Sequence, residues 1–180
     1  MGTTGTCAPV EERQGAITFK SKPVTLLGPQ IKVGSKAPDF EVLALDLTPA
    51  TLATFAGKPL VISVTPSLDT GICDQQAKRF NEEAAQLPNV QMINISVDLP
   101  FAQKRWCGAA SAERIKTFSD HRRVSFGKAY GTLIKELRLL ARAVFVVDAS
   151  GTVRYVEYVP EVTTHPNYDA ALAAAKAFAK

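Results

Sequence analysis

Residues 64–87 read Val64-Thr-Pro-Ser-Leu-Asp-Thr-Gly-Ile-Cys-Asp-Gln-Gln-Ala-Lys-Arg-Phe-Asn-Glu-Glu-Ala-Ala-Gln-Leu87. The apolar run from Leu60 to Val64 predicts a strand that stops near Pro66, because proline has no backbone N–H to continue a ladder. A polar turn follows, and the sequence from Cys73 onward predicts a helix. We therefore expect Cys73 near the N-terminus of a helix, shortly after a strand.

The helix prediction rests on the spacing of apolar residues. On a 3.6-residue period, one face collects Cys73, Ala77, Phe80, Ala84 and Leu87. Asp69 or Thr70 is a candidate N-cap, and Pro88 follows the expected end of the helix.

Two interpretations of Cys73 follow from this position. The unpaired N–H groups and the positive dipole end of a first helical turn stabilise an anion, which favours the nucleophilic thiolate form of a cysteine there. Asp74 opposes this effect by like-charge repulsion. Alternatively, Cys73 is only a small apolar residue on the buried face of the helix.

Composition limits the class of protein. The chain has 180 residues, of which 46% are hydrophobic, enough for one globular core and few for two. Its formal charge of +4 comes from scattered basic residues, so we do not expect nucleic acid as a partner. There is no apolar run long enough to cross a bilayer, and residues 1–15 lack the apolar core of a signal peptide. We expect no membrane association.

The cysteines and histidines do not predict a metal site. Cys7, Cys73 and Cys107 are far apart in sequence and only two histidines accompany them, which does not match the ligand spacing of a zinc site. Three cysteines do not form a disulfide scaffold, and in a reducing compartment a pair is expected to cycle between redox states.

Along the chain we expect a flexible leader over residues 1–16 and a single domain over residues 17–180. The predicted elements are a hairpin over 17–27, a strand over 41–45, a helical turn over 51–57, a strand over 90–97, a short helix over 98–108 ending before Gly108, an exposed strand or loop over 115–120, a helix over 124–130, a loop or short helix over 132–142, a hairpin over 143–159 and a helix over 167–180. The strand, helix, strand order over 60–97 predicts a parallel crossover in an α/β fold. The loop before Cys73 would then leave the carboxyl end of a central strand, where such sheets bind ligands.

Three motifs, in order, resemble one known family. Thr65-Pro-Ser-Leu-Asp-Thr-Gly-Ile-Cys73 is similar to the active-site loop of the peroxiredoxin superfamily. Together with Val97-Asp-Leu-Pro-Phe-Ala-Gln103 and Arg105-Trp-Cys-Gly108, it resembles the bacterial thiol peroxidases, an atypical two-cysteine group of that superfamily. The likeness extends from about Ile17 to the C-terminus.

This resemblance implies a thioredoxin-like fold, with a central mixed sheet flanked by helices and an N-terminal β-hairpin. It implies a thiol-specific peroxidase that reduces hydrogen peroxide and organic hydroperoxides to water and alcohols. Cys73 would be the peroxidatic cysteine that becomes a sulfenic acid, and Cys107 the resolving cysteine that forms an intrachain disulfide with it. Thioredoxin would re-reduce the disulfide, and we expect the segments around both cysteines to rearrange when it forms.

The resemblance also assigns supporting residues. Thr70 would hydrogen-bond the thiolate and the peroxide, Pro66 would shield the pocket from water, and Arg142 would stabilise the thiolate and the leaving oxygen. No cofactor or metal is implied. A homodimer is implied, and we expect a cytoplasmic location, with the periplasm as the other compartment considered.

The residues alone leave other interpretations open. Arg142 could be a surface cation, Thr70 only a helix cap, and Cys107 a buried apolar residue beside Trp106. A redox-sensing protein whose thiols switch a binding surface, or a purely structural disulfide, would use the same two cysteines without turnover.

Overall fold

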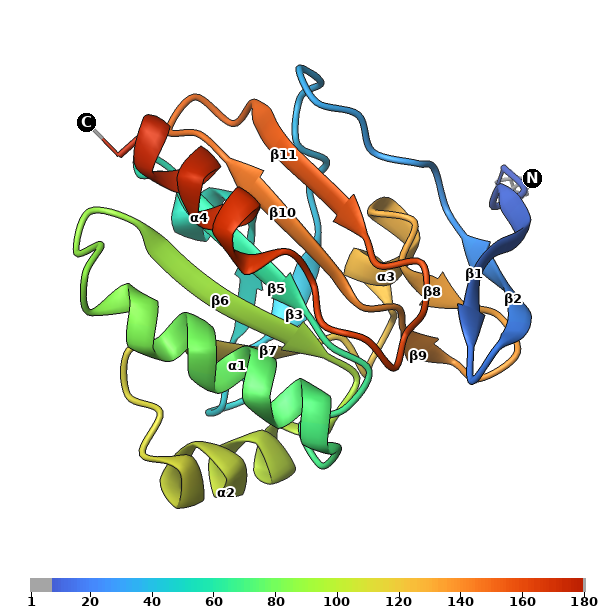
Figure 1. The fold of residues 1–180 in the computed structure, drawn as a ribbon, viewed down its shortest axis with the longest axis horizontal. Helices are drawn as coiled ribbons and strands as arrows, with labels where there is room; N and C mark the ends of the chain where they lie inside the picture. Colours follow the sequence, from blue (N-terminus) through green and yellow to red (C-terminus); the bar gives the residue numbers. More distant parts are fainter. Residues whose placement is uncertain (1–7, 180) are drawn as a thin grey trace, which may run out of the picture.

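A mixed sheet of seven strands forms the centre of the molecule. The computed structural model describes residues 8–179. The strand order is β11-β10-β5-β6-β7-β3-β4 (Figure 1). The strands are β3 (Glu41–Leu43), β4 (Pro49–Thr51), β5 (Leu60–Val64), β6 (Gln91–Ser96), β7 (Lys116–Ser119), β10 (Ala143–Val147) and β11 (Val153–Tyr158). β5, β6 and β7 run parallel, and the other pairs are antiparallel. This arrangement is the predicted α/β class with a central mixed sheet.

A smaller sheet contains the N-terminal hairpin. Its order is β1-β2-β8-β9, and the strands are β1 (Glu12–Phe19), β2 (Lys22–Leu27), β8 (Leu133–Ile134) and β9 (Leu139–Leu140). The two-residue turn of the hairpin has φ values of 50° at Lys20 and 64° at Ser21, the left-handed geometry that matches the twist of paired strands. The hairpin predicted from the sequence is therefore present.

The N-terminal boundary differs from the expectation. β1 begins at Glu12, so residues 12–16 belong to a strand and not to a leader. The Arg13 side chain fixes this segment by donating to the backbone carbonyls of Gly28 and Gly131. Residues 1–7 of the expected leader, with Cys7, lie outside the described residues.

Helices cover both faces of the central sheet. They are α1 (Gly71–Ala84), α2 (Pro100–Ala110), α3 (Ser125–Ala129), α4 (Tyr168–Ala177) and the short 3-10 helix η1 (Leu52–Phe55). α1, α2 and α4 contribute to one apolar cluster, and Figure 1 shows α1 and α4 crossing the near face of the sheet. α3 and η1 contribute to the cluster on the other face. Side chains alternate along β5, so that Val61 faces the first cluster and Ile62 the second.

The helix starts follow the predicted caps. Thr70 is the N-cap of α1, which places Cys73 in the first turn. Pro100 occupies the first turn of α2, where its missing N–H costs nothing. The Asn167 side chain accepts a hydrogen bond of 3.0 Å from Ala170 N and caps α4.

Three predicted segments are corrected. α2 continues through Gly108 to Ala110, and Ser111 ends it in the left-handed conformation that glycine usually supplies. Residues 116–119 form β7 inside the sheet, between β6 and β3, and most of this strand is buried and not exposed. The 132–142 segment contains β8 and β9 in place of a loop or short helix, because its apolar residues pair as a short antiparallel ladder.

No helix between residues 8 and 179 is long and apolar enough to cross a bilayer.

Candidate active site

The loop between β5 and α1 is held by a carboxylate at the end of the neighbouring strand. Ser67 Oγ donates to Asp98 Oδ1 at 2.7 Å, and Leu68 N donates to Asp98 Oδ2 at 2.8 Å. Ser96 Oγ also donates to Asp98 Oδ2, at 2.7 Å. Because three donors converge on one carboxylate, the loop has a fixed position over the carboxyl ends of β5 and β6.

Cys73 lies at the centre of this site, fully buried and present as a free cysteine. Thr70 Oγ1 lies 2.7 Å from Cys73 Sγ, and Arg142 Nη2 donates to the sulfur at 3.3 Å. The Thr70 hydroxyl has one proton and a second acceptor, Ser67 O at 3.0 Å. The geometry therefore allows Thr70 to donate to a thiolate, or to accept from a thiol while it donates to Ser67.

Arg142 is buried, with 2% of its surface exposed, so it is not a surface cation. Its Nε donates to Val162 O and its Nη1 to Gln76 Oε1, both at 2.8 Å. These two bonds hold the guanidinium so that Nη2 reaches Cys73. Arg142 thus places a fixed, buried cationic donor beside the sulfur.

Gln76 is a site residue that the sequence analysis missed. It is fully buried on α1, and its Nε2 donates to Ser63 Oγ at 2.8 Å and to Val64 O at 3.3 Å. Gln76 thus connects Arg142 to the central strand β5. An amide three residues after Cys73, on the apolar face of the predicted helix, was the available signal, because a buried polar side chain needs partners.

A cavity of about 380 Å³ adjoins the site; we call it the active cavity. It is lined by Phe19, Lys20, Pro66, Ser67, Thr70, Gly71, Ile72, Leu139, Arg142, Val162 and Thr163. Its walls therefore come from the hairpin tip, the β5–α1 loop, β9 and the segment after β11. The structure places Pro66, Thr70 and Arg142, three of the predicted site residues, around one mostly apolar space beside Cys73.

Cys107 is placed apart from this group. It is a free, partly buried cysteine on α2, and its Sγ lies 3.4 Å from Thr117 Oγ1 on β7. The two cysteines are thus not bonded to each other in this state. Both lie on the sheet face covered by α1 and α2, with Cys107 packed against the same apolar cluster as α1.

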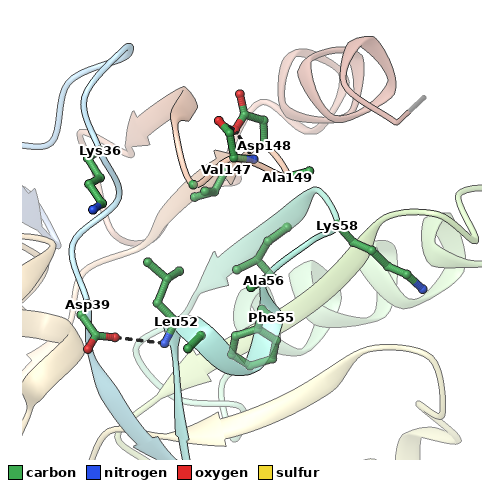
Figure 2. A pocket seen from close by; sticks show the side chains of 13 residues that line it. Lys36, Asp39, Leu52, Phe55, Ala56, Lys58, Val147, Asp148 and Ala149 are labelled. Carbon is green, nitrogen blue, oxygen red and sulfur yellow. Dashed lines mark hydrogen bonds between the residues drawn. The ribbon is translucent and has the colours of Figure 1, made fainter.

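A second cavity lies at the opposite end of β5 and has a different character. Figure 2 shows part of its lining, in which Lys36, Lys58, Asp39 and Asp148 accompany apolar side chains such as Leu52 and Phe55. The cavity has a volume of about 310 Å³. Asp39 Oδ1 accepts from Leu52 N at 3.2 Å, and Asp148 accepts from Arg154 Nε at 2.7 Å. Its carboxylates are already occupied by bonds within the fold, so this cavity is not the candidate site.

The charge of Arg142 also acts on Tyr168. Burial raises the pKa of Tyr168 although the charges of Arg142 and Arg79 oppose the shift. Arg79 itself donates to Glu83 at 3.0 Å and lies over the Tyr168 ring. Over residues 8–179, no group of histidine, cysteine, aspartate or glutamate side chains is arranged to hold a metal ion.

Fold and site together define a class of protein. A cysteine in the first turn of a helix, with a hydroxyl and a guanidinium on its sulfur, is arranged for nucleophilic and redox chemistry of the thiol. The apolar cavity beside it can hold a small substrate. The molecule is therefore an α/β protein whose buried cysteine is arranged for thiol chemistry.

Comparison with known proteins narrows the class. The Redoxin family model matches residues 32–172. Thiol peroxidases of Halalkalibacterium halodurans and Bacillus subtilis are 62% and 58% identical over 90% and 91% of this chain, and over 98% of each relative. A solved structure of a peroxiredoxin-like protein from Aquifex aeolicus is 39% identical, covers 92% of this chain and 98% of its own, and superposes with a TM-score of 0.85. The chain belongs to the redoxin family and, within it, to the thiol peroxidases of the peroxiredoxin superfamily.

The resemblance, the thioredoxin-like fold and the peroxidase activity expected from the sequence are thereby confirmed. The activity is the thiol-dependent reduction of peroxides.

Proposed function

We propose that Cys73 is the peroxidatic cysteine, that Cys107 resolves its sulfenic acid, and that thioredoxin reduces the resulting disulfide. The observation that carries the first assignment is the pair of donors on Cys73 Sγ, Thr70 Oγ1 at 2.7 Å and Arg142 Nη2 at 3.3 Å. Of the two cysteines in the described residues, only Cys73 has a cationic donor on its sulfur.

In the first step the Cys73 thiolate attacks the terminal oxygen of the peroxide. A sulfur–oxygen bond forms, the oxygen–oxygen bond breaks, and the leaving oxygen takes a proton to become an alcohol or water. Thr70 and Arg142 are placed to hold the attacked peroxide and to stabilise the charge that moves from sulfur to the leaving oxygen. Pro66, buried in the cavity wall, keeps water from the reacting atoms.

The active cavity supports a range of peroxides. Phe19, Ile72, Leu139 and Val162 give it apolar walls, and its volume of about 380 Å³ exceeds the space that hydrogen peroxide needs. We therefore propose that organic hydroperoxides are substrates together with hydrogen peroxide.

In the second step Cys107 condenses with the sulfenic acid. Its thiol attacks the Cys73 sulfur, a disulfide forms, the sulfur–oxygen bond breaks, and the hydroxyl leaves as water with the thiol proton. A reduced dithiol protein of the thioredoxin type then attacks the disulfide through a mixed disulfide and restores both thiols. Because this reductant works in a reducing compartment, we propose the cytoplasm as the location, and we propose a homodimer as the working form.

Peroxide turnover driven by NADPH, thioredoxin reductase and thioredoxin tests the proposal. Wild type should turn over, Cys73→Ser should not react with peroxide, and Cys107→Ser should form a sulfenic acid without thioredoxin-driven turnover. Cys7→Ser is the matched control and should keep the wild-type rate. Full thioredoxin-driven turnover by Cys107→Ser would refute its resolving role, and sedimentation velocity checks the dimer.

A further inference from the structure

The residues next to the two cysteines are bonded to each other. Asp74 directly follows Cys73, Trp106 directly precedes Cys107, and Trp106 Nε1 donates to Asp74 Oδ1 at 2.9 Å. The two sulfurs meanwhile contact other groups, Cys73 with Thr70 and Arg142 and Cys107 with Thr117. The start of α1 and the last turns of α2 are thus joined by a hydrogen bond that leaves the cysteines apart.

The Trp106 partner of this hydrogen bond is buried, and the Asp74 side chain is 30% exposed. Trp106 is 8% exposed and packs in the same apolar cluster as Ala77 and Phe80 of α1. Burial alone would raise the pKa of Asp74, but hydrogen bonds from Lys78 and Trp106 lower it, so the carboxylate stays a charged acceptor. A hydrogen bond to a charged group is stronger than a neutral one.

A second contact joins the same two elements at the surface. Arg105 Nη2 lies 3.5 Å from Asp69 Oδ1, with 74% and 64% of their side chains exposed. An ion pair so exposed is screened by water and salt and contributes little. Of these two polar contacts between α2 and the start of α1, the Trp106 bond is therefore the stronger.

No disulfide is formed in this arrangement, because both cysteines are free and their sulfurs contact other groups. A disulfide requires the Cα atoms within about 7 Å and both sulfurs directed at each other. Cys107 has to leave Thr117, and the helical turns that carry the two cysteines have to move relative to each other. Because Trp106 and Asp74 are the chain neighbours of the cysteines, their hydrogen bond must break or rotate during that movement.

We propose that Asp74 and Trp106 are positioning residues that hold Cys107 away from the oxidised Cys73, and that release of their hydrogen bond limits the rate of disulfide closure. The inference rests on the proposed two-cysteine cycle and adds the residues that set its second step. It predicts that these residues fix the lifetime of the sulfenic acid. A longer lifetime gives a second peroxide more time to oxidise it to the sulfinic acid.

The test separates the two steps of the cycle in the full-length protein. Reduced protein is mixed with hydrogen peroxide, quenched at set times with a thiol-blocking reagent and a sulfenic acid trap, and analysed by mass spectrometry. Sulfenic acid formation depends on peroxide concentration, whereas disulfide closure does not. Trp106→Phe keeps an aromatic ring in the cluster and removes the N–H donor, and Asp74→Ala removes the acceptor.

Both variants should close the disulfide faster than wild type, on the order of tenfold for the loss of one hydrogen bond to a charged group. Trp106→Phe should react with peroxide within about twofold of the wild-type rate, because it leaves Thr70 and Arg142 in place. Arg105→Met is the matched control: it removes the exposed ion pair with Asp69, at 3.5 Å, between the same two elements and should leave both rates unchanged.

The double variant decides between a hydrogen bond and loosened packing. If the bond is the cause, Trp106→Phe with Asp74→Ala closes no faster than the faster single variant, because both remove the same interaction. Additive acceleration, or closure at the wild-type rate in both single variants, would overturn the inference while the two-cysteine cycle stands. A wild type that forms the sulfenic acid but never the disulfide would refute the proposed cycle and this inference with it.

Discussion

Replacing Thr70 with valine tests the part of the site that the sequence could interpret in two ways. Valine keeps the β-branched shape and the extended N-cap conformation, and it removes the hydroxyl. That hydroxyl is directed at Cys73 Sγ, at 2.7 Å, and at Ser67 O, while the α1 cap is made by the Thr70 backbone through Asp74 N at 2.9 Å. Thr70→Val should therefore lower the rate of peroxide reduction and leave the stability of α1 unchanged.

The size of the effect follows from the exposure of the two groups. A hydrogen bond to a charged group contributes about 1.5–3 kcal/mol when both groups are buried. Cys73 is buried, but Thr70 is exposed, so water can partly replace the hydroxyl. We expect the low end of the range, a loss of about 1.5–2 kcal/mol, which lowers the rate constant for peroxide reduction by about 10-fold to about 30-fold.

Stopped-flow oxidation of reduced protein by hydrogen peroxide measures this constant, and urea unfolding of the same samples measures stability. Thr70→Ser is the matched control, because it restores the hydroxyl and should recover most of the rate. A Thr70→Val protein that reacts as fast as wild type would refute the reasoning. An equal loss in Thr70→Ser would do so as well, since the effect would then come from shape and not from the hydroxyl.

Three further changes have defined outcomes. Arg142→Met should slow peroxide reduction by about 100-fold or more, because the buried positive charge beside the Cys73 sulfur is lost. The exposed Arg123→Met is the control and should keep the wild-type rate. Equal rates in the two variants would contradict the role assigned to Arg142. Gln76→Leu should slow the same step by about tenfold, because Arg142 loses one of its two anchors, and a wild-type rate measured by stopped flow would show that Val162 O alone holds it. Burial raises the pKa of Asp120 from 3.8 to about 6, so the folded chain binds this proton more tightly than the unfolded chain does. The free energy of unfolding should therefore fall as the pH rises from about 4 to about 6, by up to about 3 kcal/mol. Asp120→Asn cannot bind this proton, so its unfolding free energy should lack this part of the fall. The difference between variant and wild type, measured by urea unfolding at each pH, should therefore change between pH 4 and pH 6. A constant difference would argue against the raised pKa of Asp120.

Local sequence predicted the elements whose signals are local. The apolar run of β5, the spacing of α1, Pro100 at the start of α2 and Asn167 at the start of α4 all lie within one or two helical turns of the element they define. The prediction for residues 132–142 was wrong because the interaction that decides their structure is not local. The leucines of this segment are compatible with either a helix or a short ladder, and pairing with β2, more than a hundred residues earlier, decides the outcome.

The same distinction applies to the site. The positions of Cys73, Thr70, Pro66 and Arg142 were predicted from motifs, and the structure brings them together; their roles stay predictions. Gln76 and Asp98 were missed because each acts through partners about thirty to about seventy residues away, and the sequence alone does not show which distant groups meet in a buried network.

The contact between the β1–β2 hairpin and residues 160–162 affects when the site is completed during synthesis. Thr18 N donates to Pro160 O at 2.8 Å and Val162 N donates to Thr18 O at 2.9 Å, so the tip of the first hairpin is held by a segment near the end of the chain. Val162 O is also a partner of Arg142, and Phe19 and Val162 line the active cavity. Contacts between residues so distant in sequence require the whole intervening chain to be present and its loop to close. A nascent chain that has released only residues 1–140 from the ribosome therefore carries Cys73 without its arginine or a closed cavity, and the site is complete only once Val162 and Thr163 have also been made.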